Sequence, residues 1–468
     1  MMNRWLKTTG FEQLWRVIIA VVAVGSIGPI ALRCMPGSGW SLGAVPAYGA
    51  DGSGSPLTLR GQIPIAGGAQ TVSLNGTTAF VCAPGTIDII DVTDPTNLSV
   101  GKSFGSGGTC TLAGNQLVAF GSGDPFPVNI YSVANLANPQ LLGSTSINYI
   151  YPHQLLVSGN YGFVSNLEFD FDGGLNVTAQ HGDLESVSLS PASSPGLADV
   201  LFNTTGPPKG GNKNVWAGTI ANSTTLLIGS TTSTGSNVVD GIGQVLIVDI
   251  SNPTAMAVAG TLDIPGTLQL TGIAIQGSTA LAVGSSGSWN SGQSDLGLTG
   301  HIVLTTLDVT DPRHPSIIAQ QNMSRASRGL DAAPIGIGGG LFATANLGPV
   351  GGQPEVIVVN ASDPHNIVPS EVTVPADVTG LASGNGELYT ASAAGLLIYD
   401  IGATPSGCAG DCEGSGDVTV NEIIILVNID LGTADPSACP NGIPSGDTVD
   451  ITLIVQAVNN ALNSCPAS

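Results

Sequence analysis

The sequence has few charged side chains, and very few of these are basic. Only 9% of its 468 residues are charged, and 11 lysines and arginines stand against 33 aspartates and glutamates, for a net charge of −22. So acidic a surface repels the phosphate backbone of nucleic acids and attracts cations. We therefore expect no nucleic-acid partner, and we expect calcium to be a natural ligand.

The sequence also lacks a recognisable set of catalytic residues. It has only five histidines, no His-Glu-x-x-His motif and no phosphate-binding loop. His153 is the most interesting of these histidines, because Tyr151-Pro152-His153 aligns with the start of an innermost strand in the repeats described below. A general base needs an orienting partner within hydrogen-bond reach, and the sequence supplies none for His153. We therefore name no catalytic residue.

Glycine and proline are abundant instead, with 65 and 30 residues, and 42% of the chain is hydrophobic. This apolar content is high enough for the chain to fold, and the glycine and proline content predicts many short strands joined by turns. The length allows two or three domains.

The N-terminus has the three-part pattern of an export signal. Basic residues precede the apolar run 17–32, and a small-residue cleavage site follows at 47–50. A membrane anchor is the alternative, but the run is short for a span and contains two glycines and a proline. We expect residues 1–50 to be a signal peptide, with no stable membrane span after its removal and a secreted or cell-surface location on a bacterium.

One stretch recurs along most of the chain. Residues 245–253 read Val-Leu-Ile-Val-Asp-Ile-Ser-Asn-Pro, an apolar strand closed by Asp and followed by an Asn-Pro turn. A β-rich unit repeated at a period of tens of residues indicates a solenoid, a propeller or an array. The other six variants lie at 87–95, 130–133, 187–191, 307–312, 358–364 and 397–400.

Each unit contains four predicted strands, which is the content of one propeller blade. The closing positions Asp91 and Asp400 are 309 residues apart over six intervals, about 52 residues per unit. The last unit lacks a fourth strand, and residues 57–63 supply a spare one at the start. We therefore predict a mainly β fold, a seven-bladed β-propeller over 51–401 that its N-terminal strand closes.

The units differ mainly in inserts between their second and third strands, at 167–183 and 285–299. Insertions confined to one connection lie on one face of the disc, commonly the binding face. The motif resembles the LVIVD-repeat family of bacterial surface and secreted proteins, which is expected to form β-propellers. The resemblance is specific at 87–95, 245–253 and 307–312 and weakest in the third unit, 161–203.

The repeat pattern ends at a short linker, residues 402–407, and a different kind of sequence follows. Residues 411–422 fit the calcium-loop template, with oxygen-bearing residues at positions 1, 3, 5, 7, 9 and 12 and glycine at position 6. An ordinary glycine-rich turn is the alternative. A helix is predicted over 421–431, and the expected ligands are Asp411, Glu413, Ser415, the carbonyl of Asp417, Thr419 and a bidentate Glu422.

Residues 442–462 repeat this loop and helix in altered form. Gly442, Pro444 and Leu453 occupy positions 1, 3 and 12, so three oxygen ligands are missing. Two tandem loop-helix units of this length look like a type I dockerin-like module over 408–468. The resemblance implies two calcium ions and a cohesin-like partner, and the lost ligands leave one expected ion.

Four cysteines lie in this module, Cys408, Cys412, Cys439 and Cys465, and they allow three pairings. Export favours disulfides over a four-thiolate zinc site. The chain ends of a module with internal two-fold symmetry meet, so Cys465 is expected to bond Cys408 or Cys412 and Cys439 the other. Cys82 and Cys110, in successive units, are candidates for a further bridge.

One acidic cluster lies in the repeat region, where Glu168, Asp170 and Asp172 alternate with two phenylalanines. Strand alternation places the three carboxylates on one face, as either a second cation site or a solvated strand face. The sequence predicts a secreted, calcium-dependent interaction protein with an unknown ligand on the propeller. The alternative is a propeller hydrolase or lyase acting on extracellular polysaccharide, with its acids in the same insert.

Overall fold

The computed structural model describes residues 56–121, 126–147, 151–171, 177–201, 213–232, 242–287, 300–326, 330–346, 352–401, 409–412, 418–439, 442–443 and 449–463. The predicted signal peptide and linker lie outside these residues. Within them, no helix has the length and apolar character needed to cross a membrane.

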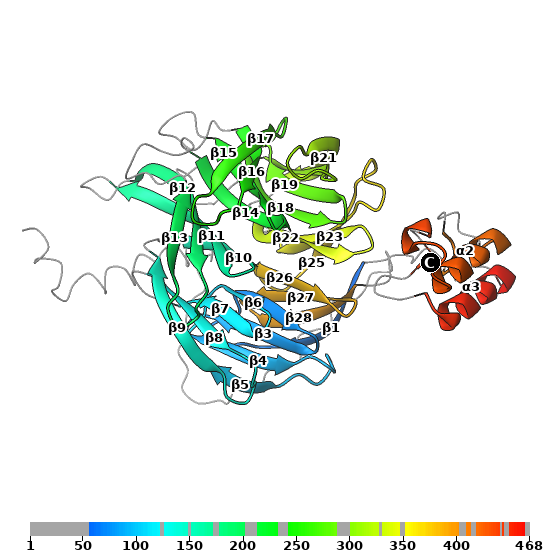
Figure 1. Cartoon of the computed structure of the whole chain (residues 1–468), viewed down its shortest axis with the longest axis horizontal. Coiled ribbons are helices and arrows are strands. Elements are labelled where there is room, and N and C mark those ends of the chain that lie inside the picture. The colour runs from blue at the N-terminus through cyan, green and yellow to red at the C-terminus, as the bar shows by residue number, and fades with distance from the viewer. Residues whose placement is uncertain are drawn as a thin grey trace, which may run out of the picture.

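The repeat region forms seven four-stranded antiparallel sheets, which confirms the predicted seven blades (Figure 1). Each of the first six blades uses four consecutive strands. Blades 1 to 3 comprise β2 (Thr71–Asn75), β3 (Thr78–Ala83), β4 (Thr86–Asp91), β5 (Val100–Phe104); β6 (Cys110–Ala113), β7 (Gln116–Phe120), β8 (Phe126–Ser132), β9 (Gln140–Ile147); and β10 (Tyr151–Ser158), β11 (Tyr161–Phe171), β12 (Val177–Ser188), β13 (Gly196–Leu201).

Blades 4 to 6 follow the same order. They comprise β14 (Lys213–Asn222), β15 (Thr225–Thr232), β16 (Ile242–Asp249), β17 (Ala257–Asp263); β18 (Gln269–Gln276), β19 (Thr279–Ser285), β20 (His301–Asp308), β21 (Ser316–Ala326); and β22 (Leu330–Gly338), β23 (Leu341–Asn346), β24 (Glu355–Asn360), β25 (Val368–Thr373).

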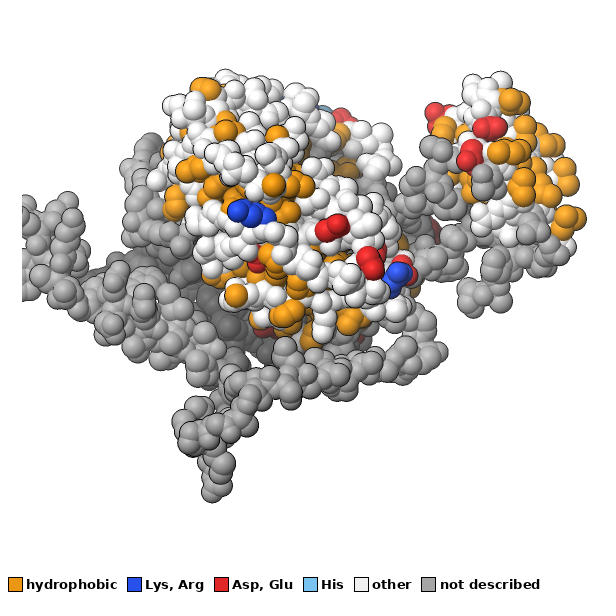
Figure 2. Space-filling view, turned by 90° about the horizontal axis from the view of Figure 1, so that it is seen from below, with side chains coloured by type: hydrophobic (Ala, Val, Ile, Leu, Met, Phe, Trp, Pro, Cys, Tyr) orange, Lys and Arg blue, Asp and Glu red, His pale blue; other side chains and the backbone are white. Residues whose placement is uncertain are grey.

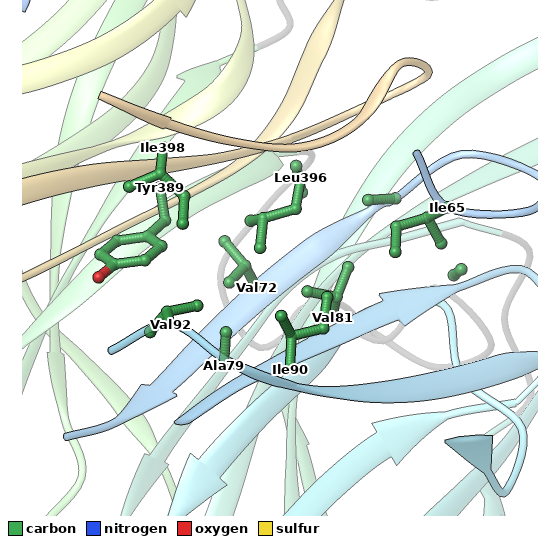
Figure 3. Close-up of a cluster of buried hydrophobic side chains, with 12 residues drawn as sticks. Ile65, Val72, Ala79, Val81, Ile90, Val92, Tyr389, Leu396 and Ile398 are labelled. Atoms are coloured by element: carbon green, nitrogen blue, oxygen red, sulfur yellow. The ribbon is translucent and has the colours of Figure 1, made fainter. Parts of the chain in front are cut away.

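The seventh blade joins the two ends of the repeat region. Its strands are β26 (Val378–Gly384), β27 (Glu387–Ser392) and β28 (Gly395–Ile401), and β1 (Leu57–Ile63) pairs antiparallel with β28. A buried apolar cluster then fills the space between blades 7 and 1, with Tyr389 and Leu396 of blade 7 on one side and Val81 and Ile90 of blade 1 on the other (Figure 3). This closure is the predicted one, and it covers the edge of β28 that would otherwise end a three-stranded blade.

All seven copies of the repeated motif become third strands, and their polar residues explain the turn that follows. In blade 1, Asp91 Oδ1 accepts hydrogen bonds from the backbone N–H of Thr93 at 2.9 Å and from its hydroxyl at 2.6 Å. Asp94 accepts the same pair from Thr96, at 3.0 and 2.7 Å. The Asp-x-Thr-Asp-Pro sequence therefore encodes two consecutive Asx turns.

In several blades, the turn after the third strand also contacts the preceding blade. Pro95 lies so close to β1 that a Cβ on Gly61 would be 1.7 Å from the Pro95 oxygen. At another joint, the hydroxyl of Thr306 donates a 2.6 Å hydrogen bond to the oxygen of Pro364. The motif thus defines both a strand and the joint between two blades.

The two faces of the disc differ in their connections. Every first-to-second strand connection contains two residues, for example 76–77 in blade 1 and 277–278 in blade 5. Second-to-third connections lie on the opposite face because successive strands are antiparallel, and they reach 233–241 in blade 4 and 286–300 in blade 5. Connection length therefore varies widely on this face, whereas the third-to-fourth connections on the other face contain seven or eight residues.

The insert 167–183 lies between the second and third strands of blade 3, as predicted, and residues 168–171 are extended. Most of it does not form a separate loop, because β11 and β12 continue in register through it, with Glu168 opposite His181 and Asp170 opposite Ala179. The neighbouring strands end earlier, so this part is a two-stranded extension of the blade. Asp172 and the side chains of Glu168 and Asp170 lie outside the described part.

The C-terminal unit contains two helices, α2 (Val420–Asp430) and α3 (Ile451–Asn463), and a short 3-10 turn, η1 (Pro436–Ala438). The helix α2 begins one residue before its predicted start at 421. The apolar core between them includes Leu426, Leu453 and Ala457 together with the cysteines described below.

Candidate calcium site in the C-terminal unit

The start of the predicted calcium loop is fixed against the second half of the unit. The N–H of Gly410 donates to the oxygen of Gly442 at 2.9 Å, and Asn460 Nδ2 donates to the oxygen of Ala409 at 2.9 Å. Gly410 has φ +102°, a backbone conformation that favours glycine, and a Cβ there would lie 2.4 Å from Ala457 Cβ. These contacts set the position of Asp411.

The end of the loop is fixed by a helix cap. Glu422 Oε2 accepts hydrogen bonds from the N–H of Thr419 at 2.7 Å and from its hydroxyl at 2.8 Å. Because Thr419 donates this proton, its hydroxyl oxygen keeps lone pairs with which to accept or coordinate. Thr419 and Glu422 are therefore held together at the start of α2.

The two terminal carboxylates of the loop are buried. Asp411 is 1% exposed and Glu422 is 4% exposed. Residues 402–468 contain eight aspartates and glutamates but no lysine, arginine or histidine. A buried carboxylate is costly unless a positive charge compensates it, and no basic side chain of this unit can do so. Hydrogen bonds, such as the two that Thr419 donates to Glu422, and a bound cation are the forms of compensation left within the unit.

Three of the six predicted ligands, Asp411, Thr419 and Glu422, are described, and Glu413, Ser415 and Asp417 lie outside the described part. Among described residues, no three His, Cys, Asp or Glu side chains form a metal-binding group. The three described residues fit calcium, because they offer only oxygen donors from both ends of the loop. Calcium would supply positive charge between carboxylates that otherwise repel.

The second half of the unit cannot repeat this arrangement. A Cβ on Gly442 would lie 2.8 Å from Cys439 Sγ and 2.9 Å from the backbone nitrogen of Asp411. Leu453, which takes the place of Glu422, is buried in the apolar core. A disulfide and a leucine therefore occupy the space that a second metal loop would need.

Two disulfides are present in the described part. Cys412 bonds Cys439, which agrees with one of the predicted alternatives, and Cys82 bonds Cys110, as predicted. The second bridge joins β3 of blade 1 to β6 of blade 2. Cys408 and Cys465 lie outside the described residues, so their pairing stays a prediction.

Sequence reasoning missed the apolar outer surface of the two helices. Figure 2 shows hydrophobic side chains gathered on this unit. Six of them are at least half exposed, and they form three pairs separated by 31 residues in the sequence, Val420 and Ile451, Ile424 and Val455, and Leu431 and Leu462. The repeated spacing of 31 residues could have revealed this surface from the sequence. It marks apolar positions that both halves share and that neither half buries in its core.

The other candidate residues do not form a described site. The side chain of His153 lies outside the described part. Two carboxylates of β12 that are described, Asp183 and Glu185, are buried at 1% and 0% exposure. Neither carboxylate is therefore open to solvent.

Comparisons with known proteins support the repeat and the fold. A family model of the LVIVD repeat matches residues 66–104, which include all of blade 1, and residues 237–264 in blade 4. A search of curated protein sequences found no match.

Solved structures with similar folds are remote in sequence. Hydrazine synthase of Kuenenia stuttgartiensis has 10% identity over 72% of this chain and 97% of that chain, with a TM-score of 0.49. The WD40 β-propeller domain of Doa1 has 11% identity over 74% and 97%, with a TM-score of 0.47. Sqt1 of Saccharomyces cerevisiae has 8% identity over 74% and 85%, with a TM-score of 0.46. These likenesses carry no argument about function. The chain carries LVIVD repeats, and its repeat region is a seven-bladed β-propeller.

Proposed function

We propose that this protein is an exported binding protein. Its propeller presents a ligand-binding or protein-binding face, and its C-terminal unit attaches it to another exported protein in a calcium-dependent manner. The observation that carries the proposal is the duplicated apolar surface of α2 and α3.

The six exposed side chains are all large and aliphatic. Removing apolar surface from water is worth about 25 cal/mol per Å². A unit of this size gains nothing for its own fold from residues left in water, and contiguous exposed apolar surface commonly marks a contact with another protein. The partner that fits is a protein with an apolar face, as the dockerin-like resemblance also implies for a cohesin-like partner.

Calcium connects the site to this surface. Val420 and Ile424 lie on the same helix as Glu422, and the capping contact of Thr419 with Glu422 fixes the start of that helix. A cation that compensates Asp411 and Glu422 would stabilise α2 and with it the orientation of the apolar side chains. Binding of the partner should therefore require calcium.

Export is supported by the disulfides and by the N-terminal pattern. Disulfides form and persist in oxidising compartments, and two are present here. The predicted signal peptide would direct the chain to export. We infer a secreted or cell-surface location.

The binding face of the propeller is inferred from its connections. The second-to-third strand connections vary widely in length among the blades, whereas on the opposite face the first-to-second turns all contain two residues and the third-to-fourth connections seven or eight. Long, variable loops on a rigid scaffold commonly carry recognition. No described residue favours the polysaccharide-degrading alternative.

The test is capture of a partner from the organism's own exported proteins by the full chain, with and without a calcium chelator. The captured protein is then purified and its binding measured directly. We expect calcium-dependent binding that Glu422→Gln weakens and that Ile424→Asp combined with Val455→Asp abolishes. Asp400→Asn, which changes an exposed carboxylate of the propeller, is the matched control and should bind normally.

Two results would overturn the proposal. One is partner binding that persists unchanged when calcium is removed. The other is light scattering that shows calcium-dependent self-association, abolished by the same apolar substitutions, since a second copy would then occupy this surface.

A further inference from the structure

We propose that the Cys412–Cys439 disulfide positions the first and last ligands of the calcium loop. Calcium affinity and the redox state of this disulfide are then thermodynamically linked. The inference rests on the proposed calcium site and adds a residue pair that controls it.

The disulfide contacts both ends of the loop. Cys412 directly follows Asp411, and its Sγ lies 4.0 Å from the backbone oxygen of Glu422. This is a packing contact, because a sulfur in a disulfide has no proton to donate. Cys412 is 4% exposed, so it lies inside the unit, next to Asp411 in the chain and against the backbone of Glu422.

The partner sulfur fixes the same region from the other side. Cys439 Sγ lies against Gly442, whose oxygen accepts the hydrogen bond from Gly410 N–H, one residue before Asp411. The bridge therefore joins the loop to the segment that anchors it. Breaking the bridge would remove the covalent link next to Asp411 and leave the core packing of Ala409 and the hydrogen bonds of Gly410 and Asn460 to hold it.

Separation of the sulfurs changes the spacing of the ligands. Reduction of the bridge takes two electrons and two protons from a dithiol such as dithiothreitol, breaks the S–S bond and leaves two thiols, while the reductant closes into a cyclic disulfide. Two thiol sulfurs no longer held at bonding distance need more room than the buried site offers. Asp411 and Glu422 would then no longer be held at a fixed separation. Ordering of the loop on calcium binding would cost conformational entropy and lower the affinity.

Linkage makes the effect reciprocal. If the oxidised form binds calcium more tightly by some factor, calcium must stabilise the disulfide over the dithiol by the same factor. Residues that orient metal ligands typically change affinity by about 10- to 100-fold when altered. A tenfold change corresponds to a reduction potential about 30 mV more negative with calcium bound.

Calorimetry on the full chain with calcium chloride tests the first half of this linkage. We expect one ion bound to the unaltered chain and at least tenfold weaker binding in Cys412→Ser with Cys439→Ser. The propeller offers a matched control, because Cys82 and Cys110 form a buried bridge far along the chain from the loop. Cys82→Ser with Cys110→Ser should leave calcium affinity within about twofold.

The effect of calcium on the redox equilibrium can be measured without a variant. The unaltered chain is equilibrated in dithiothreitol redox buffers with and without calcium, and the oxidised fraction of each cysteine pair is read by alkylation and mass spectrometry. We expect calcium to shift the Cys412–Cys439 equilibrium toward the disulfide and to leave Cys82–Cys110 unmoved. If the serine variant fails to fold, this measurement still tests the linkage.

The outcomes separate the two proposals. Unchanged calcium affinity in the serine variant, or a redox equilibrium that calcium does not move, would overturn the linkage while the metal site stands. Absence of calcium binding in the unaltered, oxidised chain would overturn the metal site itself.

Discussion

The hydroxyl of Thr379 donates a 2.9 Å hydrogen bond to the backbone oxygen of Gln70, which lies 309 residues earlier in the chain. Next to it, the N–H of Ala69 donates to the oxygen of Ser392 at 2.8 Å. These bonds join the first two strands of blade 7 to the segment that leads into β2 of blade 1, while β1 completes blade 7 at its outer edge. The ring is therefore closed both by these hydrogen bonds and by the pairing of β1 at the outer edge of blade 7.

Deletion of residues 57–63 should open the ring at the outer edge. It would expose the hydrogen-bonding edge of β28 and part of the cluster shared by blades 7 and 1, so we expect aggregation and a lower melting temperature. Light scattering and thermal unfolding measure both. The control is Arg60→Ala, which removes only an exposed ion pair with Asp400 and should change stability by less than about 1 kcal/mol. A soluble deletion variant of unchanged melting temperature would contradict the role of β1.

Gly61→Ala should weaken the same joint through sterics. The added Cβ would lie 1.7 Å from the oxygen of Pro95, and this backbone contact cannot relax cheaply. We expect destabilisation of about 1–3 kcal/mol in thermal or denaturant unfolding. Gly196→Ala is the matched control, because Gly196 also lies in a fourth strand and nothing lies within 4 Å of its Cβ position. Equal effects of the two substitutions would refute the steric argument.

The blades could be predicted because the repeated motif contains its own turn chemistry. Asp91 and Asp94 each bond a nearby threonine, so the strand end and the turn are both local properties of the sequence. The third unit was hard to recognise because Ser188 replaces the closing Asp. Its hydroxyl donates to the Ser190 oxygen at 3.1 Å instead of accepting, so the turn lacks the usual signature.

Other features depend on contacts that the sequence does not encode locally. Six of the seven described third-to-fourth strand pairs contain a bulge, and the extra residue shows no distinct sequence pattern. The pairing of Cys412 with Cys439 was one of the open alternatives until the two chain segments were placed. In the candidate site, the absence of basic residues after His365 was visible in the sequence, but its meaning depended on the burial of Asp411 and Glu422.

The Cys82–Cys110 bridge should stabilise the joint between blades 1 and 2. It closes a loop with a sequence separation of 28, and the chain-entropy relation gives about 3–4 kcal/mol for a loop of this length. Cys82→Ala with Cys110→Ala should therefore lower the melting temperature of the propeller in calorimetry. Addition of dithiothreitol to this variant should cause no further change in the propeller transition, whereas the unaltered chain should shift toward the variant. A variant as stable as the unaltered chain would show that the joint does not need the bridge.

Acid should destabilise the propeller partly through its turn aspartates. Hydrogen bonds from the side chain and backbone of Thr93 lower the pKa of Asp91, and Thr310 acts in the same way on the pKa of Asp308. A pKa lowered on folding contributes stability that is present above the unfolded value, about 4, and is lost as pH falls through the folded value. Melting temperature should therefore fall between about pH 5 and pH 2.

Asn360 provides a natural comparison for this effect. Its Oδ1 accepts hydrogen bonds from the N–H and hydroxyl of Ser362, at 3.0 and 2.7 Å, without an ionisable group. Asp91→Asn with Asp308→Asn should keep the turns and reduce the acid-induced fall in melting temperature. A fall as steep as that of the unaltered chain would show that these two aspartates do not contribute.

Restoring ligands to the second loop should fail to create a second calcium site. Gly442→Asp with Leu453→Glu supplies carboxylates at positions 1 and 12, but the new Cβ at residue 442 would lie 2.8 Å from Cys439 Sγ and 2.9 Å from Asp411 nitrogen. Glutamate at 453 would also place a charge where leucine is buried in the core, at a cost that typically exceeds 1 kcal/mol. We expect a lower melting temperature for the helical unit and no second ion in calorimetry. Leu453→Met is the control for core packing and should retain one ion and near-normal stability. Two ions bound by the double variant would show that the disulfide and the leucine do not block the second loop.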